Sequence, residues 1–216
     1  MARNKYPEET VEKILTAARR LFLEKGYEHT TIQDIVDQLD GLTKGAIYHH
    51  FKSKEEILTA LKDDMYSEAD VFHDMEQQTG LNGLEKLRYV LRRNQEYQTT
   101  PENIGISRQF VPLLENPHIL ANMIRGNRDN LSPRFLALIQ EGQRDGSIHT
   151  DYAQELAELL SLLELWLGPT VYPASPEGER RKLELIQEMY AHFGIPLITD
   201  EFIDQVCTGI YGDGEP

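Results

Sequence analysis

The stretch from Thr30 to Phe51, TTIQDIVDQLDGLTKGAIYHHF, limits what this chain can fold into more than any other part of it. Its first half carries apolar residues at helical spacing, which predicts a short helix with one buried face: Ile32, Ile35, Val36 and Leu39. Thr30 followed by Gln33 matches a capping box, so this helix is expected to begin there.

A second short helix is expected directly after a break at Gly41. Thr43 is a suitable N-cap, and the helix should run from Lys44 to about Phe51. Ile47 and Phe51, four residues apart, share one face and can anchor it against the first helix. Two short helices joined by a tight turn predict a helix-turn-helix, whose second helix enters the major groove of DNA.

The polar side chains of the second helix favour the same interpretation. Cationic and hydroxyl groups can hold phosphates, and so can the free amides at a helix N-terminus. Gly45 has no side chain, so its backbone could approach a base or phosphate closely. From spacing alone, a helical hairpin with a solvated polar face explains the pattern equally well.

The segment TTIQDIVDQL followed by GLTKGAIYHHFKSKEEIL resembles the DNA-binding domain of the tetracycline-repressor (TetR) family. The resemblance covers about the first 60 of 216 residues. Between Gln38 and Lys44 the chain has LDGLT, one residue longer than the family's commonest AGVS-type turn, so a slightly altered turn is expected. The resemblance implies that phosphates are held mainly by Thr31, Tyr48, His50, Lys52 and Lys54. It implies contacts to base edges or neighbouring phosphates for Thr43, Lys44, Gly45 and His49.

The rest of the chain predicts an all-α fold, because apolar periods alternate with Gly and Pro breaks and no alternating strand pattern occurs. We expect a DNA-binding domain over residues 1–53 and a helical ligand-binding and dimerisation domain over 54–216. A first helix should brace the hairpin, and a fourth should begin at a Ser53–Glu56 capping box. The expected helices are 7–25, 54–78, 84–98, 106–114, 118–144 (one helix, or two meeting near residue 132), 152–167, 179–193 and 199–211.

The net charge of −14 argues superficially against nucleic acid, but the acid is unevenly distributed. Residues 1–60 carry nine Lys/Arg and ten Asp/Glu, which leaves −13 of the net charge on the other 156 residues. Local arrangement sets phosphate affinity, and Arg3, Lys5, Lys44, Lys52 and Lys54 can gather on one side.

A homodimer is expected, because one short helix reads too few base pairs and operators usually mirror a two-fold axis. Helix 152–167 is apolar around much of its circumference and should be buried on more than one side. We expect helices 152–167 and 179–193 to form a four-helix bundle with their symmetry mates, as the resemblance also implies. A monomer core that buries the same residues is the alternative.

The resemblance implies an inducer pocket in the C-terminal domain, although aromatic residues at helical spacing are more often simply core. Polar Asn94, Gln109 and Glu164 would orient a ligand if they face inward. The candidate ligand-binding residues are Tyr66, Tyr89, Tyr97, Phe110, Met123, Phe135, Glu164 and Trp166.

No catalytic motif, metal-ligand spacing or cofactor loop is present, so an enzyme is not expected and neither is a cofactor or metal. The lone cysteine and the apolar-poor N-terminus predict a cytoplasmic protein that does not enter a membrane. The sequence therefore predicts a DNA-binding transcriptional regulator, a repressor that leaves its operator when a small-molecule inducer binds. Two alternatives are a protein of this fold without ligand control and a ligand-binding module with a vestigial DNA-reading surface.

Overall fold

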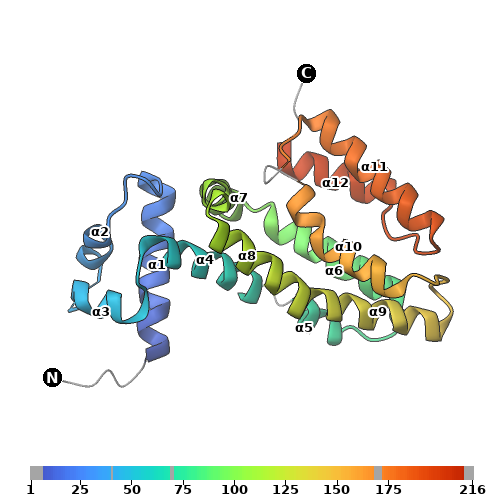
Figure 1. Ribbon diagram of the computed structural model, residues 1–216, viewed down its shortest axis with the longest axis horizontal. Coiled ribbons are helices and arrows are strands. Elements are labelled where there is room, and N and C mark those ends of the chain that lie inside the picture. Colours follow the sequence, from blue (N-terminus) through green and yellow to red (C-terminus); the bar gives the residue numbers. More distant parts are fainter. Residues whose placement is uncertain (1–6, 40, 69–70, 168–171, 212–216) are drawn as a thin grey trace. The chain divides into compact units, whose positions relative to one another are not determined.

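The computed structural model describes residues 7–39, 41–68, 71–167 and 172–211, except for the side chains of residues 7, 8, 62–68, 164, 210 and 211. Every regular element within these ranges is helical (Figure 1). The α-helices are α1 (Pro7–Lys25), α2 (Ile32–Asp37), α3 (Lys44–His50), α4 (Lys54–Glu68), α5 (Val71–Glu76), α6 (Gly83–Gln98), α7 (Pro101–Phe110), α8 (Pro117–Gly126), α9 (Ser132–Asp145), α10 (Ala153–Trp166), α11 (Pro176–His192) and α12 (Asp200–Tyr211). No described helix is long and apolar enough to cross a bilayer.

The chain forms two compact units, and each is interrupted in sequence. Unit 1 comprises residues 1–68 and 101–113, and unit 2 comprises residues 69–100 and 114–216. The segment that contains α7 therefore belongs to the same compact unit as α1 to α4.

Unit 1 is built on α1, which contacts α2, α4 and α7. The apolar stripe of α1 is buried as its period predicts, and Ile14, Ala18 and Phe22 are each 0% exposed. Ile35 from α2 and Ile47 from α3 complete this core and are also fully buried. α2 and α3 lie beside α1 in Figure 1, so α1 supports the hairpin.

Unit 2 has one hydrophobic core, to which α5, α6 and the helices from α9 to α12 contribute. Its fully buried members include Leu87, Ile139, Ile186 and Tyr190. α6 and α9 approach each other closely, since a Cβ on Gly83 would lie 2.1 Å from the backbone nitrogen of Gly142. Only glycine permits that approach.

Five predicted helices are confirmed within three residues at each end: 7–25, 84–98, 152–167, 179–193 and 199–211. The fourth helix was expected to run from residue 54 to residue 78; α4 covers Lys54–Glu68 and α5 covers Val71–Glu76, and residues 69 and 70 lie outside the described residues. α7 begins at Pro101, earlier than expected, and a 3-10 turn, Val111–Glu115, follows it.

The segment predicted as one helix or two over residues 118–144 is two α-helices joined by a π-helical turn, Asn127–Leu131. The sequence marks the junction only through Pro133, because proline is suited to the first turn of a new helix. The predicted division of function after residue 53 stays a prediction, since the compact units divide the chain at different residues.

Candidate nucleic-acid interface

α3 is amphipathic over its short length. The Thr43 hydroxyl accepts a hydrogen bond from the Ala46 amide at 3.3 Å, so Thr43 is the N-cap that the sequence predicts. Ile47 is 0% exposed and Phe51, which ends the helix, is 8% exposed. These two anchors orient the helix, so its other side is directed to solvent.

The exposed side of α3 presents four of the predicted DNA contacts. Lys44, Gly45, Tyr48 and His49 are all exposed, and Tyr48 keeps 46% of its surface despite its size. Among the described residues, no hydrogen bond or ion pair engages the side chains of Lys44 or Tyr48, so both are available to an external group.

His50, the last residue of α3, and Lys52, just beyond the helix, extend this surface. Lys52 is exposed, whereas His50 is half-buried. The His49 and His50 rings are in edge-to-face contact with centroids 5.2 Å apart, so each ring restricts the orientation of the other. Arg3 and Lys5 lie outside the described residues.

The turn and the start of α3 use glycine in two different ways. Gly41 has φ of 77°, a left-handed conformation that glycine adopts without strain. Gly45 is helical, and a Cβ there would meet nothing closer than the Thr43 hydroxyl, at 3.8 Å. The fold therefore does not require glycine at position 45.

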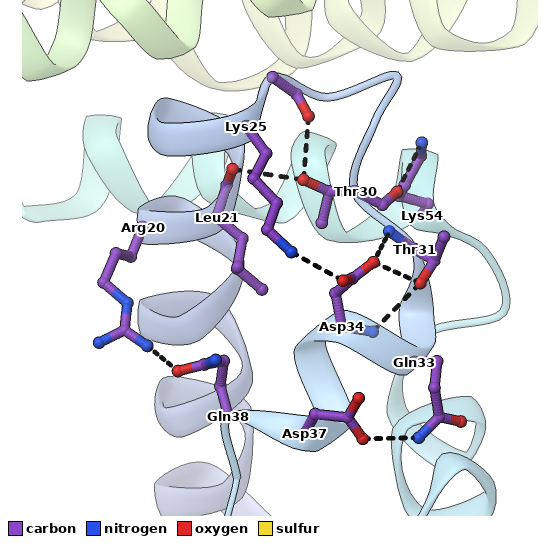
Figure 2. Close-up of polar contacts among 11 residues, drawn as sticks. Arg20, Leu21, Lys25, Thr30, Thr31, Gln33, Asp34, Asp37, Gln38 and Lys54 are labelled. Atoms are coloured by element: carbon purple, nitrogen blue, oxygen red, sulfur yellow. Dashed lines mark hydrogen bonds and ion pairs between the residues drawn. The ribbon is translucent and has the colours of Figure 1, made fainter.

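The capping box at the start of α2 is one residue later than predicted. Thr31, not Thr30, is the N-cap, and its partner is Asp34 (Figure 2). The Thr31 amide and hydroxyl both donate to Asp34 Oδ2, at 2.8 and 2.5 Å. Thr30 instead turns inward, where its hydroxyl bonds the carbonyls of Leu21 and Gly26.

This geometry bears on the predicted phosphate contact of Thr31. A hydroxyl has a single proton to donate, and in Thr31 that proton is shared with Asp34. Phosphate oxygens accept hydrogen bonds, so Thr31 could donate to a phosphate only by releasing Asp34. Its side chain is otherwise exposed.

Asp34 also ties α2 to α1, as Figure 2 shows. Lys25 Nζ lies 2.8 Å from Asp34 Oδ1. Hydrogen bonds from Lys25 and then from Thr31 hold the pKa of the Asp34 carboxyl well below its usual range. Arg20 of α1 donates to Gln38 at the far end of α2, so both ends of α2 are attached to α1.

Lys54 differs from the other predicted phosphate ligands, because its ammonium is already engaged. Lys54 Nζ donates to the carbonyls of Tyr27 and Thr30, at 2.6 and 3.0 Å, and lies 4.1 Å from the centroid of the Tyr27 ring. Burial, with a smaller effect of Glu55 and Glu28, raises the pKa of Tyr27 to about 12. Lys54 therefore joins the start of α4 to the loop between α1 and α2.

The sequence did not predict that α7 packs against α1 in unit 1. Gln109 Nε2 donates to the Phe22 carbonyl at 2.7 Å, and Arg19 pairs with Glu102 at 3.3 Å. A Cβ on Gly105 would lie 2.6 Å from a methyl group of Leu23. Because α7 is separated from α1 by more than 70 residues, no local pattern could have revealed this packing.

The predicted ligand-binding residues are not brought together in one compact unit. Phe110 is buried in unit 1, and Gln109 is engaged with α1. Phe135 is core in unit 2, packed on Phe72 with ring centroids 5.5 Å apart. Tyr89, Tyr97 and Met123 are half-buried in unit 2, while the side chains of Tyr66 and Glu164 lie outside the description.

Trp166 belongs to a different feature, an apolar groove between α10 and α11. We name this surface the α10–α11 face and define it by Leu159, Leu162, Leu163, Trp166, Leu185, Ile186 and Met189. Leu159, Leu162 and Leu185 are 44%, 40% and 55% exposed. Three large exposed side chains on one apolar surface are typical of an interaction site.

Comparison with known proteins agrees with this architecture. Residues 14–61, which contain α2 and α3, match the family described as bacterial regulatory proteins, tetR family. The chain is 30% identical over 155 residues to the transcriptional repressor KstR2 of Rhodococcus jostii, covering 67% of this chain and 71% of the relative. It is 29% identical over 185 residues to the transcriptional repressor AcnR of Corynebacterium glutamicum, covering 84% and 92%.

Similarity to solved structures extends over the whole length. A transcriptional regulator of the TetR/AcrR family from Thermobifida fusca is 25% identical, with a TM-score of 0.60, over 96% of this chain and all of that one. The hairpin supported by α1, the larger helical unit and these relatives lead to one conclusion: this chain belongs to the TetR family of bacterial regulatory proteins.

Proposed function

We propose that this protein is a transcriptional repressor that reads operator DNA with α3. The observation that carries the proposal is the exposed side of α3, where Lys44 and Tyr48 are free of partners among the described residues while Ile47 is fully buried. A helix anchored on one side, with donors on the other, suits insertion in the major groove. Both sequence relatives named above are repressors, which favours repression over activation.

The proposed contacts divide into two kinds. Thr43, Lys44, Gly45 and His49 occupy the start and exposed side of α3, so they contact base edges or adjacent phosphates. Tyr48, His50 and Lys52 continue toward its end and contact phosphates, with Thr31 at the start of α2. Lys54 contributes indirectly, because it fixes α4 against the loop that carries Thr30.

The operator must first be found, and genomic footprinting of bound DNA would identify it. Fluorescence anisotropy on that duplex would then compare wild type with Lys44→Ala and Tyr48→Ala. We expect each variant to weaken operator binding about tenfold or more, which is about 1.4 kcal/mol. The control is Arg144→Ala, which removes an exposed cation of α9 in unit 2. Unchanged affinity in both α3 variants would refute the proposed reading helix.

The active form is proposed to be a homodimer that packs through the α10–α11 face. A second copy is the occupant we propose, because one α3 reads a single half-site and two-fold operators need two. The exposed leucines Leu159, Leu162 and Leu185 would then be buried, which removes their unfavourable contact with water.

We further propose that a small molecule binding in unit 2 releases the operator. The chain passes between the units three times, after residues 68, 100 and 113. A ligand that favours one state of unit 2 could therefore act on unit 1 through α4 and through both ends of α7. Its differential affinity for the two states must supply the coupling, typically about 1–3 kcal/mol.

A further inference from the structure

Lys182, in the second turn of α11, contacts three partners through its ammonium group. Its Nζ donates to the carbonyls of Trp166 and Tyr172, both at 2.6 Å, and to the Glu179 carboxylate at 3.3 Å. An ammonium has three protons to donate, so these contacts use its full capacity. The side chain is only 13% exposed and that of Glu179 is 0% exposed.

The contact with Trp166 satisfies the end of α10. The last carbonyls of a helix have no partner within the helix and carry partial negative charge, which a cation stabilises. Since Lys182 also bonds the Tyr172 carbonyl, it holds the two sides of the connection between α10 and α11. The buried Glu179 compensates the charge of Lys182, because a lone buried charge would be costly.

The same ammonium acts on the indole of Trp166, lying 5.7 Å from the centroid of the ring. Trp166 is part of the α10–α11 face, together with Leu163 and Leu185. Lys182 therefore restrains both the backbone and the ring of the aromatic residue in that face. Aromatic side chains commonly dominate the free energy of an interface when they are held in a defined place.

We propose that Lys182 is a positioning residue for self-association: it fixes Trp166 in the conformation that a second copy of the chain packs against. This inference rests on the proposed homodimer. Lys182 itself need not touch the partner, because it acts through Trp166 and through the end of α10.

The test uses Lys182→Met, which keeps the length and apolar body of the side chain but removes its charge and donors. Analytical ultracentrifugation would measure the dimer dissociation constant, and fluorescence would follow Trp166, the only tryptophan in the sequence. We expect the dissociation constant to rise at least about tenfold. The emission of Trp166 should shift on dilution of wild type and lose that shift in the variant over the same concentrations. Lys182→Arg retains a cation with several donors and should restore most of the association.

The matched control is Lys86→Met, which removes another partly buried lysine of unit 2, paired with Glu141 at 2.5 Å. Lys86 lies on α6 and does not line the α10–α11 face. The Lys86→Met variant should therefore dimerise as wild type does. If Lys182→Met does not fold by circular dichroism, Glu179→Gln with Lys182→Met removes both buried charges and should weaken association equally. Wild-type dissociation constants in the folded charge-removing variant would overturn the proposal.

The underlying dimer has a separate test. Leu159→Glu and Leu185→Glu place charges directly on the α10–α11 face and should produce monomers. If these variants dimerise normally, the proposed homodimer interface fails. If they are monomeric while Lys182→Met associates as wild type, only the role of Lys182 fails.

Discussion

At the scale of single residues, Lys52 and Lys54 show how two neighbouring lysines come to serve different purposes. Both fit a phosphate-binding pattern in the sequence, but only Lys52 is exposed. Lys54 bonds two carbonyls contributed by residues more than 20 positions earlier. Sequence spacing cannot distinguish them, because the difference depends on where the loop between α1 and α2 lies in three dimensions.

Replacing each lysine with methionine should therefore change a different property: stability for Lys54 and DNA binding for Lys52. Lys54→Met should lower the free energy of unfolding by about 1.5–3 kcal/mol, because charged hydrogen bonds to the Tyr27 and Thr30 carbonyls are lost. Lys52→Met should leave stability unchanged but reduce the salt dependence of operator binding by about one counterion. Urea unfolding and anisotropy titrations at several salt concentrations measure the two effects. A stability loss in Lys52→Met equal to that in Lys54→Met would contradict this assignment.

Replacing Gly45 should also affect protein stability and operator binding differently. Gly45→Ala should keep or raise stability by about 0.5–1 kcal/mol, because alanine favours the helix and its Cβ meets nothing closer than 3.8 Å. Operator affinity should fall about tenfold or more if the backbone approaches DNA as proposed. Equal affinity for wild type and Gly45→Ala would place the DNA farther from this residue.

Asp34 makes stability depend on pH in a predictable direction. Its pKa is lowered in the folded state, so its contribution is present above its ordinary value of about 3.9 and is lost as pH falls toward the folded pKa. Asp34→Asn should be less stable than wild type at pH 7, and the difference should shrink below about pH 4. Thermal melts of both proteins across that range provide the measurement. A difference that stays constant with pH would show that the carboxylate charge contributes nothing.

At the scale of elements, local signals predicted helix position well where a period and a cap coincide. α3 has an N-cap at Thr43, two buried anchors and a preceding glycine, so both ends of that helix followed from the sequence. The capping box of α2 was misplaced by one residue, because Thr30 and Thr31 are chemically alike. Tertiary packing resolves the choice: Thr30 is 1% exposed and bonds inward, which leaves Thr31 as the cap.

The crossing of α6 and α9 gives a prediction that belongs to this scale. Gly83→Ala should destabilise the protein by about 1–3 kcal/mol or more, because the new methyl would overlap the Gly142 backbone and the helices must separate. Gly126→Ala is the control, since a Cβ there meets nothing within 4 Å. Urea unfolding followed by circular dichroism distinguishes them, and two equally stable variants would mean that the crossing can relax without cost.

At the scale of the whole molecule, the sequence predicted the fold class and the hairpin, and its division of function after residue 53 stays a prediction. The predicted boundary at residue 53 coincides with the expected start of the fourth helix. The compact units instead follow long-range packing, which brings α7 to α1 through Gln109 and Glu102. Among the candidate ligand residues whose side chains are described, Phe110 lies in unit 1 and the others lie in unit 2. Helical spacing identifies apolar faces but not the elements that they meet.

The return of the chain to unit 1 at α7 restricts how such a regulator can be recombined. A chimaera made by a single cut after residue 68 would keep α1, α2 and α4 but would lack α7, which also packs against α1. The Phe22 carbonyl would lose the hydrogen bond donated by Gln109, and Leu23 would lose its packing against Gly105. A chimaera that joins unit 1 to the ligand-binding unit of another regulator must therefore include residues 101–113 together with residues 1–68. The two units can be exchanged only as interleaved segments.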